Sequence, residues 1–264
     1  MSVSIQFFGV AGYKIVTAGG CHVLIDPFLD DNPYSPVKSA DLDRVDLLLV
    51  THNAWDHFGD AAKIVKKQGC LAVGALDVIH NLVHYHGVDK DLVRPTIWGM
   101  VIEACGIQVR PVESHHWSFA RTQDGHLLSG PAMGYVFDVG DGRRMYHPGD
   151  TALFSDMKLI GELYKPTIGL MHVSLPSEKG VSLPHPEAYK TGELTPAEAL
   201  LASEWLGLTD VVVSHYVDPN TPDVREFLER VERNRAAGAY APATIVLAPG
   251  ETHEWPAPPA RAGR

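Results

Sequence analysis

The chain has 264 residues, a formal net charge of −10, 45% hydrophobic residues and 20% charged residues. Such a composition is typical of a globular protein with a sizeable core. Lys and Arg never form runs longer than two residues. This argues against a nucleic-acid partner, because binding to a phosphate backbone needs a basic stripe. The start of the chain does not resemble a signal peptide, and no apolar run could span a membrane, so we expect no membrane partner.

The cysteines indicate the redox environment. Cys21, Cys70 and Cys105 are widely spaced and form no CxxC pair. An odd set of isolated cysteines is typical of buried free thiols in a reducing compartment. We therefore expect free thiols and a cytoplasmic location.

The chain opens with a predicted meander of short antiparallel strands, and strand and helix patterns alternate after a loop at residues 30–36. Strands are predicted at residues 4–8, 13–16, 22–26, 47–50, 71–74, 101–102, 107–112, 134–139, 143–146, 167–173, 211–213 and 244–247. Helices are predicted at residues 60–68, 76–86, 153–164, 195–206 and 221–237. No composition shift marks a linker, so we predict a single domain over residues 1–255 and a flexible tail over residues 256–264.

Short motifs specify local structure at several points. Residues 195–198, Thr-Pro-Ala-Glu, form a capping box with Pro at the first helical position, which predicts a helix start. Asp141-Gly142 predicts a tight hairpin. Residues 174–194 are rich in Pro, Gly and Ser without periodicity. We predict a long loop there, which is a candidate lid or a contact in a homo-oligomer.

The segment at residues 50–60 carries the strongest chemical signal. It follows a buried strand and contains His52, Asp56 and His57. Loops at the carboxyl ends of strands commonly hold functional residues in α/β proteins, and two imidazoles with a carboxylate can converge on a metal ion. The alternative is a polar loop with incidental histidines, because His is also a common surface residue.

Similar residues follow three later strands. His115 and His116 come after residues 107–112, and Asp150 comes after residues 143–146. His215 comes after residues 211–213. Because strand ends on one side of a sheet converge in space, we expect one common site. His115 and His116 point to opposite faces of an extended segment, so we expect only one of them to be a ligand.

Residues 52–57 read His-Asn-Ala-Trp-Asp-His, and the order of ligand-type residues resembles the metallo-β-lactamase fold superfamily. The signature of that superfamily is HxHxDH followed by a His, a bridging Asp and a last His. Residues 24–28 and 147–151, Leu-Ile-Asp-Pro-Phe and His-Pro-Gly-Asp-Thr, resemble its UlaG-like metal-dependent hydrolases. Residues 116–118, His-Trp-Ser, also resemble the N-acyl-phosphatidylethanolamine phospholipase D branch. The resemblance implies an α/β fold, a four-layer αβ/βα sandwich of two mixed β-sheets flanked by helices.

The resemblance also implies a divalent metal centre of one or two ions, Zn, Mn or Fe. A first site would use His52, the residue at position 54 and His116, where the His-Trp-Ser match favours His116 over His115. The second site would use Asp56, His57 and His215, and Asp150 would bridge both. Residues with candidate substrate contacts or supporting roles are Asp26, His115, His147 and His172.

Position 54 departs from the signature. Ala54 replaces its second His, and a methyl group cannot bind a metal. Three interpretations stay open. The protein uses one ion, held mainly in the second site; or Asn53, His115 or His172 supplies a substitute donor; or the chain is an inactive relative or an engineered variant.

The resulting hypothesis is metal-assisted hydrolysis of a small-molecule lactone or other ester, phosphorylated or not. Asp56 would bind the metal and orient or deprotonate the attacking water. A phosphodiester is the alternative substrate, and a catalytically silent binding protein is the alternative function that Ala54 favours. The sequence contains neither a GxSxG elbow nor a Gly-rich phosphate loop.

Overall fold

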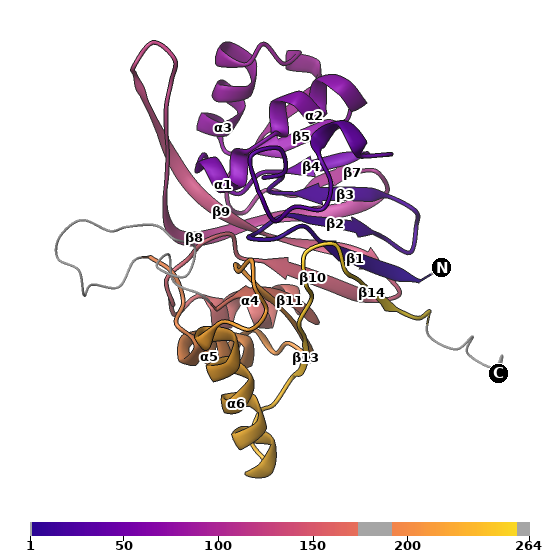
Figure 1. The fold of residues 1–264 in the computed structure, drawn as a ribbon, viewed down its shortest axis with the longest axis vertical. Helices are drawn as coiled ribbons and strands as arrows, with labels where there is room; N and C mark the ends of the chain where they lie inside the picture. The colour runs from indigo at the N-terminus through magenta and orange to yellow at the C-terminus, as the bar shows by residue number, and fades with distance from the viewer. Residues whose placement is uncertain (1, 174–191, 258–264) are drawn as a thin grey trace.

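The computed structural model describes residues 2–173 and 192–257. The loop predicted at residues 174–194 and the tail predicted at residues 256–264 therefore lie largely outside the described residues. Two seven-stranded mixed sheets pack face to face, and helices lie on both outer faces (Figure 1). The predicted four-layer α/β sandwich is confirmed.

The first sheet contains β1 (Val3–Phe7), β2 (Tyr13–Val16), β3 (His22–Ile25), β4 (Leu47–Leu49), β5 (Leu71–Gly74), β6 (Val93–Pro95) and β14 (Thr252–Trp255). Its order is β14-β1-β2-β3-β4-β5-β6. The strands from β14 to β3 pair antiparallel, which includes the predicted meander. Those from β3 to β6 pair parallel.

The second sheet contains β7 (Ile102–Ala104), β8 (Ile107–Arg121), β9 (Leu127–Gly140), β10 (Arg143–His147), β11 (Ile168–His172), β12 (Asp210–Ser214) and β13 (Ala243–Ile245). Its order is β13-β12-β11-β10-β9-β8-β7. The strands from β7 to β10 pair antiparallel, and those from β10 to β13 pair parallel. The predicted hairpin at Asp141-Gly142 joins β9 to β10 with positive φ at both residues.

Helices flank each sheet on its own side (Figure 1). The first sheet carries α1 (Trp55–Phe58), α2 (Ala61–Gln68), α3 (Leu76–His80) and a π-helical turn (Asn81–Tyr85). The second carries α4 (Met157–Tyr164), α5 (Pro196–Leu206) and α6 (Pro222–Ala236), and short 3-10 turns occur at Ser39–Asp41 and Lys90–Leu92. α5 begins at the predicted capping box, in which the Glu198 carboxylate accepts the Thr195 N–H at 2.9 Å and the Thr195 hydroxyl accepts the Glu198 N–H at 3.4 Å.

The core lies between the two sheets and beneath the helices. Residues of β1 alternate between buried and half-buried, which is typical of a strand with one face on the core. Every residue of β4 is fully buried, because the sheet covers one face of this apolar strand and helices cover the other. The loop that carries the first site residues therefore follows a strand that is packed on both faces.

Several elements differ from the sequence prediction. β8 and β9 extend well beyond residues 107–112 and 134–139 and form a projecting hairpin, whose polar residues obscure the strand pattern (Figure 1). β6 and β14 were not predicted, because both are short edge strands with little apolar alternation. The helix predicted from residue 153 begins at Met157, after a turn that is closed by the Met157 N–H and the Phe154 carbonyl.

The cysteine prediction is wrong for two residues. Cys21 and Cys105 form a disulfide, with Cα atoms 5.8 Å apart and a sequence separation of 84. Cys21 precedes β3 and Cys105 lies between β7 and β8, so the bond joins the two sheets. This long separation is the reason that spacing alone did not indicate the pair. Cys70 is a buried free thiol as expected, and burial raises its pKa to about 11.

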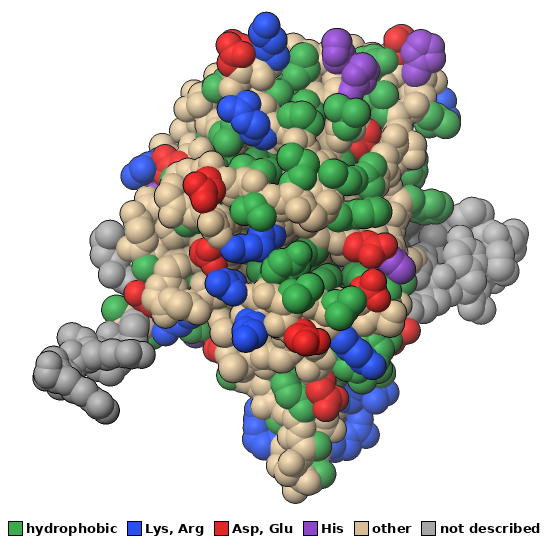
Figure 2. All heavy atoms as spheres, turned by 180° about the vertical axis from the view of Figure 1, so that it is seen from behind, with side chains coloured by type: hydrophobic (Ala, Val, Ile, Leu, Met, Phe, Trp, Pro, Cys, Tyr) green, Lys and Arg blue, Asp and Glu red, His purple; other side chains and the backbone are tan. Residues whose placement is uncertain are grey.

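The surface gives two further observations. Within the described residues, no helix combines the length and the apolar character that crossing a membrane requires. On the face opposite that of Figure 1, acidic and basic side chains are interspersed with apolar ones (Figure 2).

Candidate metal centre

The predicted ligand loop leaves β4 and turns at once into α1. Ala54 is the N-cap of this one-turn helix, and its carbonyl accepts the N–H groups of His57 at 3.1 Å and Phe58 at 2.8 Å. The turn brings His57 back against His52, with ring centroids 4.1 Å apart. His52, Asp56 and His57 are all buried. The helical turn therefore brings the side chains of these three residues together.

His215 follows β12 in a left-handed backbone conformation, with φ of 71°. Residues other than Gly rarely adopt this conformation, and it persists only where the surroundings enforce it. Val10, in the turn after β1, enforces it here. The His215 N–H donates to the Val10 carbonyl at 2.8 Å, and the Val10 N–H donates to the Tyr216 carbonyl at 2.8 Å. Such enforced strain is typical of functional sites.

A slip in the pairing of β8 with β9 directs His116 into the site. The register shifts between Glu113 and Trp117, which is a bulge that re-aims the side chains within it. His116 turns inward, whereas His115 is exposed and stacks on Phe154 at 4.3 Å. His116 therefore lies inside a long strand and not at a strand end as predicted.

Asp150 lies on the turn after β10. Gly149 before it has φ of +63°, and a Cβ at this position would lie 2.9 Å from the Thr51 Cβ. The Ser114 hydroxyl donates to the Asp150 carbonyl at 2.7 Å. These contacts fix the Asp150 main chain between β8 and the loop after β4.

The Asp150 carboxylate stands in the middle of the imidazoles. Its Oδ1 is 2.9 Å from the His215 Nε2 and 3.4 Å from the His57 Nε2, and its Oδ2 is 4.0 Å from the His116 Nε2. Ligand atoms lie within 4.8 Å of one another in two groups, His52 with His116 and Asp150, and Asp56 with His57 and His215. The structure thus brings all six predicted metal residues together.

Three imidazoles use Nδ1 to bond the protein and turn Nε2 toward the cluster. The His57 Nδ1 donates to the Asp26 Oδ2 at 2.8 Å, and the His116 Nδ1 donates to a main-chain carbonyl at 2.9 Å. The Thr51 hydroxyl donates its proton to Asp26 at 2.8 Å, so it accepts from the His52 Nδ1 at 3.0 Å. With Nδ1 protonated, the Nε2 lone pair of each neutral ring is available to a cation.

Asp26 is the carboxylate behind these imidazoles, and it is completely buried. Besides His57 and the Thr51 hydroxyl, it accepts the Thr51 N–H at 2.9 Å and bonds the His147 Nε2 at 3.1 Å. Its φ of 44° is a second strained backbone value at the site. A carboxylate in this position can orient imidazoles that bind a metal, and this supporting role of Asp26 stays a prediction.

Burial and neighbouring charges shift the pKa values of three residues at the site. Burial lowers the pKa of His52 to about 3, and the nearby charge of His57 adds to the effect. Burial also opposes a charged His57, but Asp150, Asp26 and Asp56 outweigh it and raise the His57 pKa well above its usual value. Burial tends to raise the pKa of Asp26, yet the neighbouring His57 and His147 hold it below its usual range. The three carboxylates around His57 therefore favour a positive charge in that part of the site.

These residues fit a divalent metal ion. The His52 Nε2 is buried and makes no hydrogen bond within the described part of the chain, which costs free energy unless a cation takes the lone pair. Imidazoles mixed with carboxylates are donors that suit Zn, Mn and Fe.

Comparison with known proteins agrees with this geometry. Residues 22–216 match the family described as the beta-lactamase superfamily domain. A UPF0173 metal-dependent hydrolase of Rubrobacter xylanophilus is 34% identical over 231 residues, covering 87% of this chain and 88% of the relative. The chain belongs to the UPF0173 metal-dependent hydrolases. A Thermococcus onnurineus member is 36% identical over 258 residues, covering 96% of this chain and 99% of its own.

A solved structure extends the comparison to the fold. The metallo hydrolase Igni18 from Ignicoccus hospitalis superposes with a TM-score of 0.72 at 25% identity, covering 97% of this chain and 99% of its own. The predicted metallo-β-lactamase fold is thereby confirmed for this UPF0173 protein. Its placement in the UlaG-like branch stays a prediction.

The other predicted histidines lie outside the ligand groups. His115 is exposed on β8. His147 is buried and bonds Asp26, so it supports that carboxylate and is not part of the pocket wall. His172 is buried beside His215, with ring centroids 5.7 Å apart.

Asn53, a candidate substitute donor, is turned away from the ligands. Its Nδ2 donates to the Asp77 Oδ2 at 2.8 Å, and its Oδ1 accepts the Asn81 Nδ2 at 3.0 Å. The Ser118 hydroxyl accepts the Asn53 N–H at 3.0 Å and donates to Asp77 at 2.5 Å. Asn81 lies on the π-helical turn, a feature frequent at functional sites. This buried network supports the loop beside Ala54, and no sequence motif indicated it.

Glu193 is a residue of the site that the sequence analysis missed. It is 4% exposed, and its ligand atom lies within 4.8 Å of those of Asp150 and His215. It falls in the segment predicted as loop, just before the capping box. A single Glu two residues before that box carries no recognisable signal.

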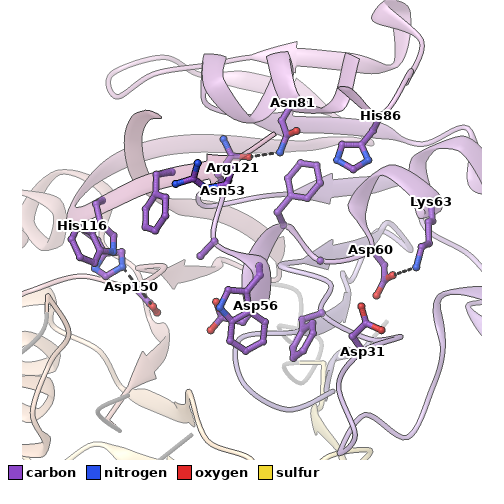
Figure 3. Close-up of a pocket in the computed structure, with 18 of the residues that line it drawn as sticks. Asp31, Asn53, Asp56, Asp60, Lys63, Asn81, His86, His116, Arg121 and Asp150 are labelled. Carbon is purple, nitrogen blue, oxygen red and sulfur yellow. Dashed lines mark hydrogen bonds and ion pairs between the residues drawn. The ribbon is translucent and has the colours of Figure 1, made fainter. Parts of the chain in front are cut away.

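A pocket of about 750 Å³ opens beside the cluster (Figure 3). Asp56, His116 and Asp150 lie in its wall, and so do Ala54 and Glu193. Much of the remaining wall is aromatic, contributed by Phe28, Trp55, Phe58, Trp117 and Phe119. The candidate metal centre is therefore open to a small molecule.

Proposed function

We propose that this UPF0173 protein hydrolyses a lactone or another carboxylic ester. A divalent metal ion would be held by the clustered residues His52, Asp56, His57, His116, Asp150 and His215. The supporting observation is that this buried donor cluster borders a pocket of about 750 Å³, a volume that suits a small-molecule substrate. The bound ion would supply Lewis-acid chemistry, lowering the pKa of water toward ~7 and polarising a substrate oxygen.

Asp56 is the residue that we assign to the attacking water. It belongs to a ligand group, it lines the pocket, and its Oδ2 is 3.9 Å from the His57 Nε2. A carboxylate between the donors and the cavity can accept a hydrogen bond from water and take its proton.

The pocket wall supports a substrate with an apolar body. Phe28 and Trp55 pack edge to face with centroids 5.0 Å apart, and Trp117 and Phe119 do so at 5.7 Å. Trp55 and Trp117 keep 63% and 70% of their surface exposed. Exposed aromatic rings at a pocket are suited to bind an acyl chain or a ring.

Two cationic side chains, Lys63 and Arg121, lie in the pocket wall and differ in how strongly other protein groups already bind them. The Lys63 ammonium lies between carboxylates of Asp30 and Asp60, at 2.8 and 2.7 Å. Arg121 has a long 3.4 Å hydrogen bond to the Gly125 carbonyl. Arg121 is therefore the better candidate to bind a phosphate or carboxylate on the substrate, which keeps phosphorylated esters within the proposal.

A second candidate function is a catalytically silent binding protein. The observation that favours it is Ala54, which removes an imidazole from the first half of the centre. A phosphodiester is the alternative substrate for the hydrolase.

Turnover measurements test the proposal. Protein stripped with a chelator is reloaded with Zn, Mn or Fe and assayed on lactones, aryl esters and a phosphodiester. We expect metal-dependent turnover of lactones or esters, reduced roughly 10²–10⁴-fold in Asp56→Asn. Turnover is expected to be unchanged in Glu229→Gln, at an exposed position of α6 outside the pocket wall. Turnover of the phosphodiester alone favours the alternative substrate, and bound metal without turnover favours the binding protein. Turnover that survives both chelation and Asp56→Asn contradicts the proposal.

A further inference from the structure

Glu193 brings an additional carboxylate to the proposed metal centre. Its ligand atom groups with those of Asp150 and His215, and all three residues are buried. It also lines the pocket together with Ala54 and His116. Glu193 therefore lies where the half of the centre around His215 meets the cavity.

The main chain on either side of Glu193 is tied to imidazoles of the site. The Gly192 carbonyl accepts the His116 Nδ1 at 2.9 Å. The Leu194 N–H donates to the His172 Nε2 at 3.0 Å. These two bonds fix the residue before and the residue after Glu193, so the carboxylate is held at the centre by two anchors.

The residues around Glu193 form a donor set that suits a cation. Glu193 and Asp150 supply carboxylates and His215 an imidazole, and their ligand atoms all lie within 4.8 Å of one another. Such mixed donors suit a divalent ion of Zn, Mn or Fe.

The three substitute donors suggested by the sequence do not serve this purpose. The Asn53 amide bonds Asp77 and Asn81, and the His115 Nε2 faces Glu113 at 3.2 Å on the exposed side of β8. The His172 Nε2 contacts the Leu194 N–H at 3.0 Å and the Thr151 carbonyl at 3.1 Å, and His172 belongs to none of the ligand groups found among the described residues.

We propose that Glu193 is an additional metal ligand in the half of this centre that contains Asp150 and His215, and that its carboxylate lets the centre keep an ion although Ala54 supplies no imidazole to the other half. The inference rests on the proposed metal-dependent function. It adds a donor from outside the HxHxDH segment and explains how the centre can tolerate Ala54.

Metal binding by three variants tests the inference. Ion content after dialysis is measured by elemental analysis, and affinity by competition with a chelator. Glu193→Gln keeps the size of the side chain and removes its charge. We expect its metal affinity to fall by at least roughly 10–100-fold, which is the loss seen when a residue that only orients a ligand is removed. Glu113→Gln on β8 is the matched control and is expected to bind like the wild type. Adding Ala54→His to Glu193→Gln is expected to restore binding.

The outcomes separate the two proposals. Wild-type affinity in Glu193→Gln, or a loss that Ala54→His does not restore, overturns the role of Glu193. A wild-type protein that binds no divalent ion overturns the metal centre itself. Glu193→Asp, which keeps the charge, is expected to bind more tightly than Glu193→Gln and serves as the test if the latter does not fold.

Discussion

The orientation of the imidazoles decides what the clustered residues can do. The sequence predicted His52, His57, His116 and His215 together with Asp56 and Asp150, because the spacing of ligand residues resembles a known signature, and the structure brings all six together. Spacing does not show which ring nitrogen faces the cluster. That choice depends on Asp26, on Thr51 and on a main-chain carbonyl, which are contacts between distant segments.

Glu193 illustrates the limit of motif reasoning at this scale. Its position follows from two hydrogen bonds to His116 and His172, residues 77 and 21 positions earlier, and not from any local pattern. The same holds for the Asp77 network under Asn53, whose members come from α3, the π-helical turn and β8. Such residues become visible only when the fold brings them together.

Replacing Asp26 by Asn tests the orientation of His57. Asp26 accepts hydrogen bonds from His57, His147 and Thr51, and an amide would place a donor against one of these donors. We expect metal affinity to fall roughly 10–100-fold, as for other outer carboxylates. The measurement is competition with a chelator, and unchanged affinity in a folded variant would mean that Asp26 does not orient the ligands.

At the scale of elements, patterned segments were predictable and edge or irregular segments were not. The β1–β3 meander, β4, β5 and the start of α5 follow from apolar runs and from a capping box. The outer half of β8 and the strands β6 and β14 lack such patterns, because their stability comes from pairing within the sheet. The bulge that directs His116 inward lies in one of these unpredicted stretches.

The capping box of α5 permits a stability test. The Thr195 hydroxyl accepts the Glu198 N–H, and Glu198 accepts the Thr195 N–H in return. Thr195→Ala removes this cap and is expected to lower the free energy of unfolding by about 1 kcal/mol. Urea unfolding measures the change. Thr195→Ser keeps the hydroxyl and should retain most of the stability, and equal losses in both variants would argue against the cap.

At the scale of the whole molecule, the two sheets were predictable from the family resemblance, but the link between them was not. The Cys21–Cys105 bond joins segments 84 positions apart, and neither cysteine lies in a motif. Only the packing of the sheets brings their Cα atoms to 5.8 Å.

Thiol titration of the denatured protein checks this bond directly. Without reductant we expect one reactive thiol, that of Cys70, and with reductant all three cysteines. Three reactive thiols without reductant would contradict the disulfide and agree with the sequence-based prediction of free cysteines.

The most direct test of the whole account is the metal content of the folded protein. Elemental analysis of protein reloaded with Zn, Mn or Fe and then dialysed is expected to find one or two ions per chain. The same analysis of the Asp56→Ala/His57→Ala variant is expected to find fewer, because two donors of one ligand group are gone. A wild-type protein that retains no divalent ion, with a content equal to that of this variant, would contradict the account.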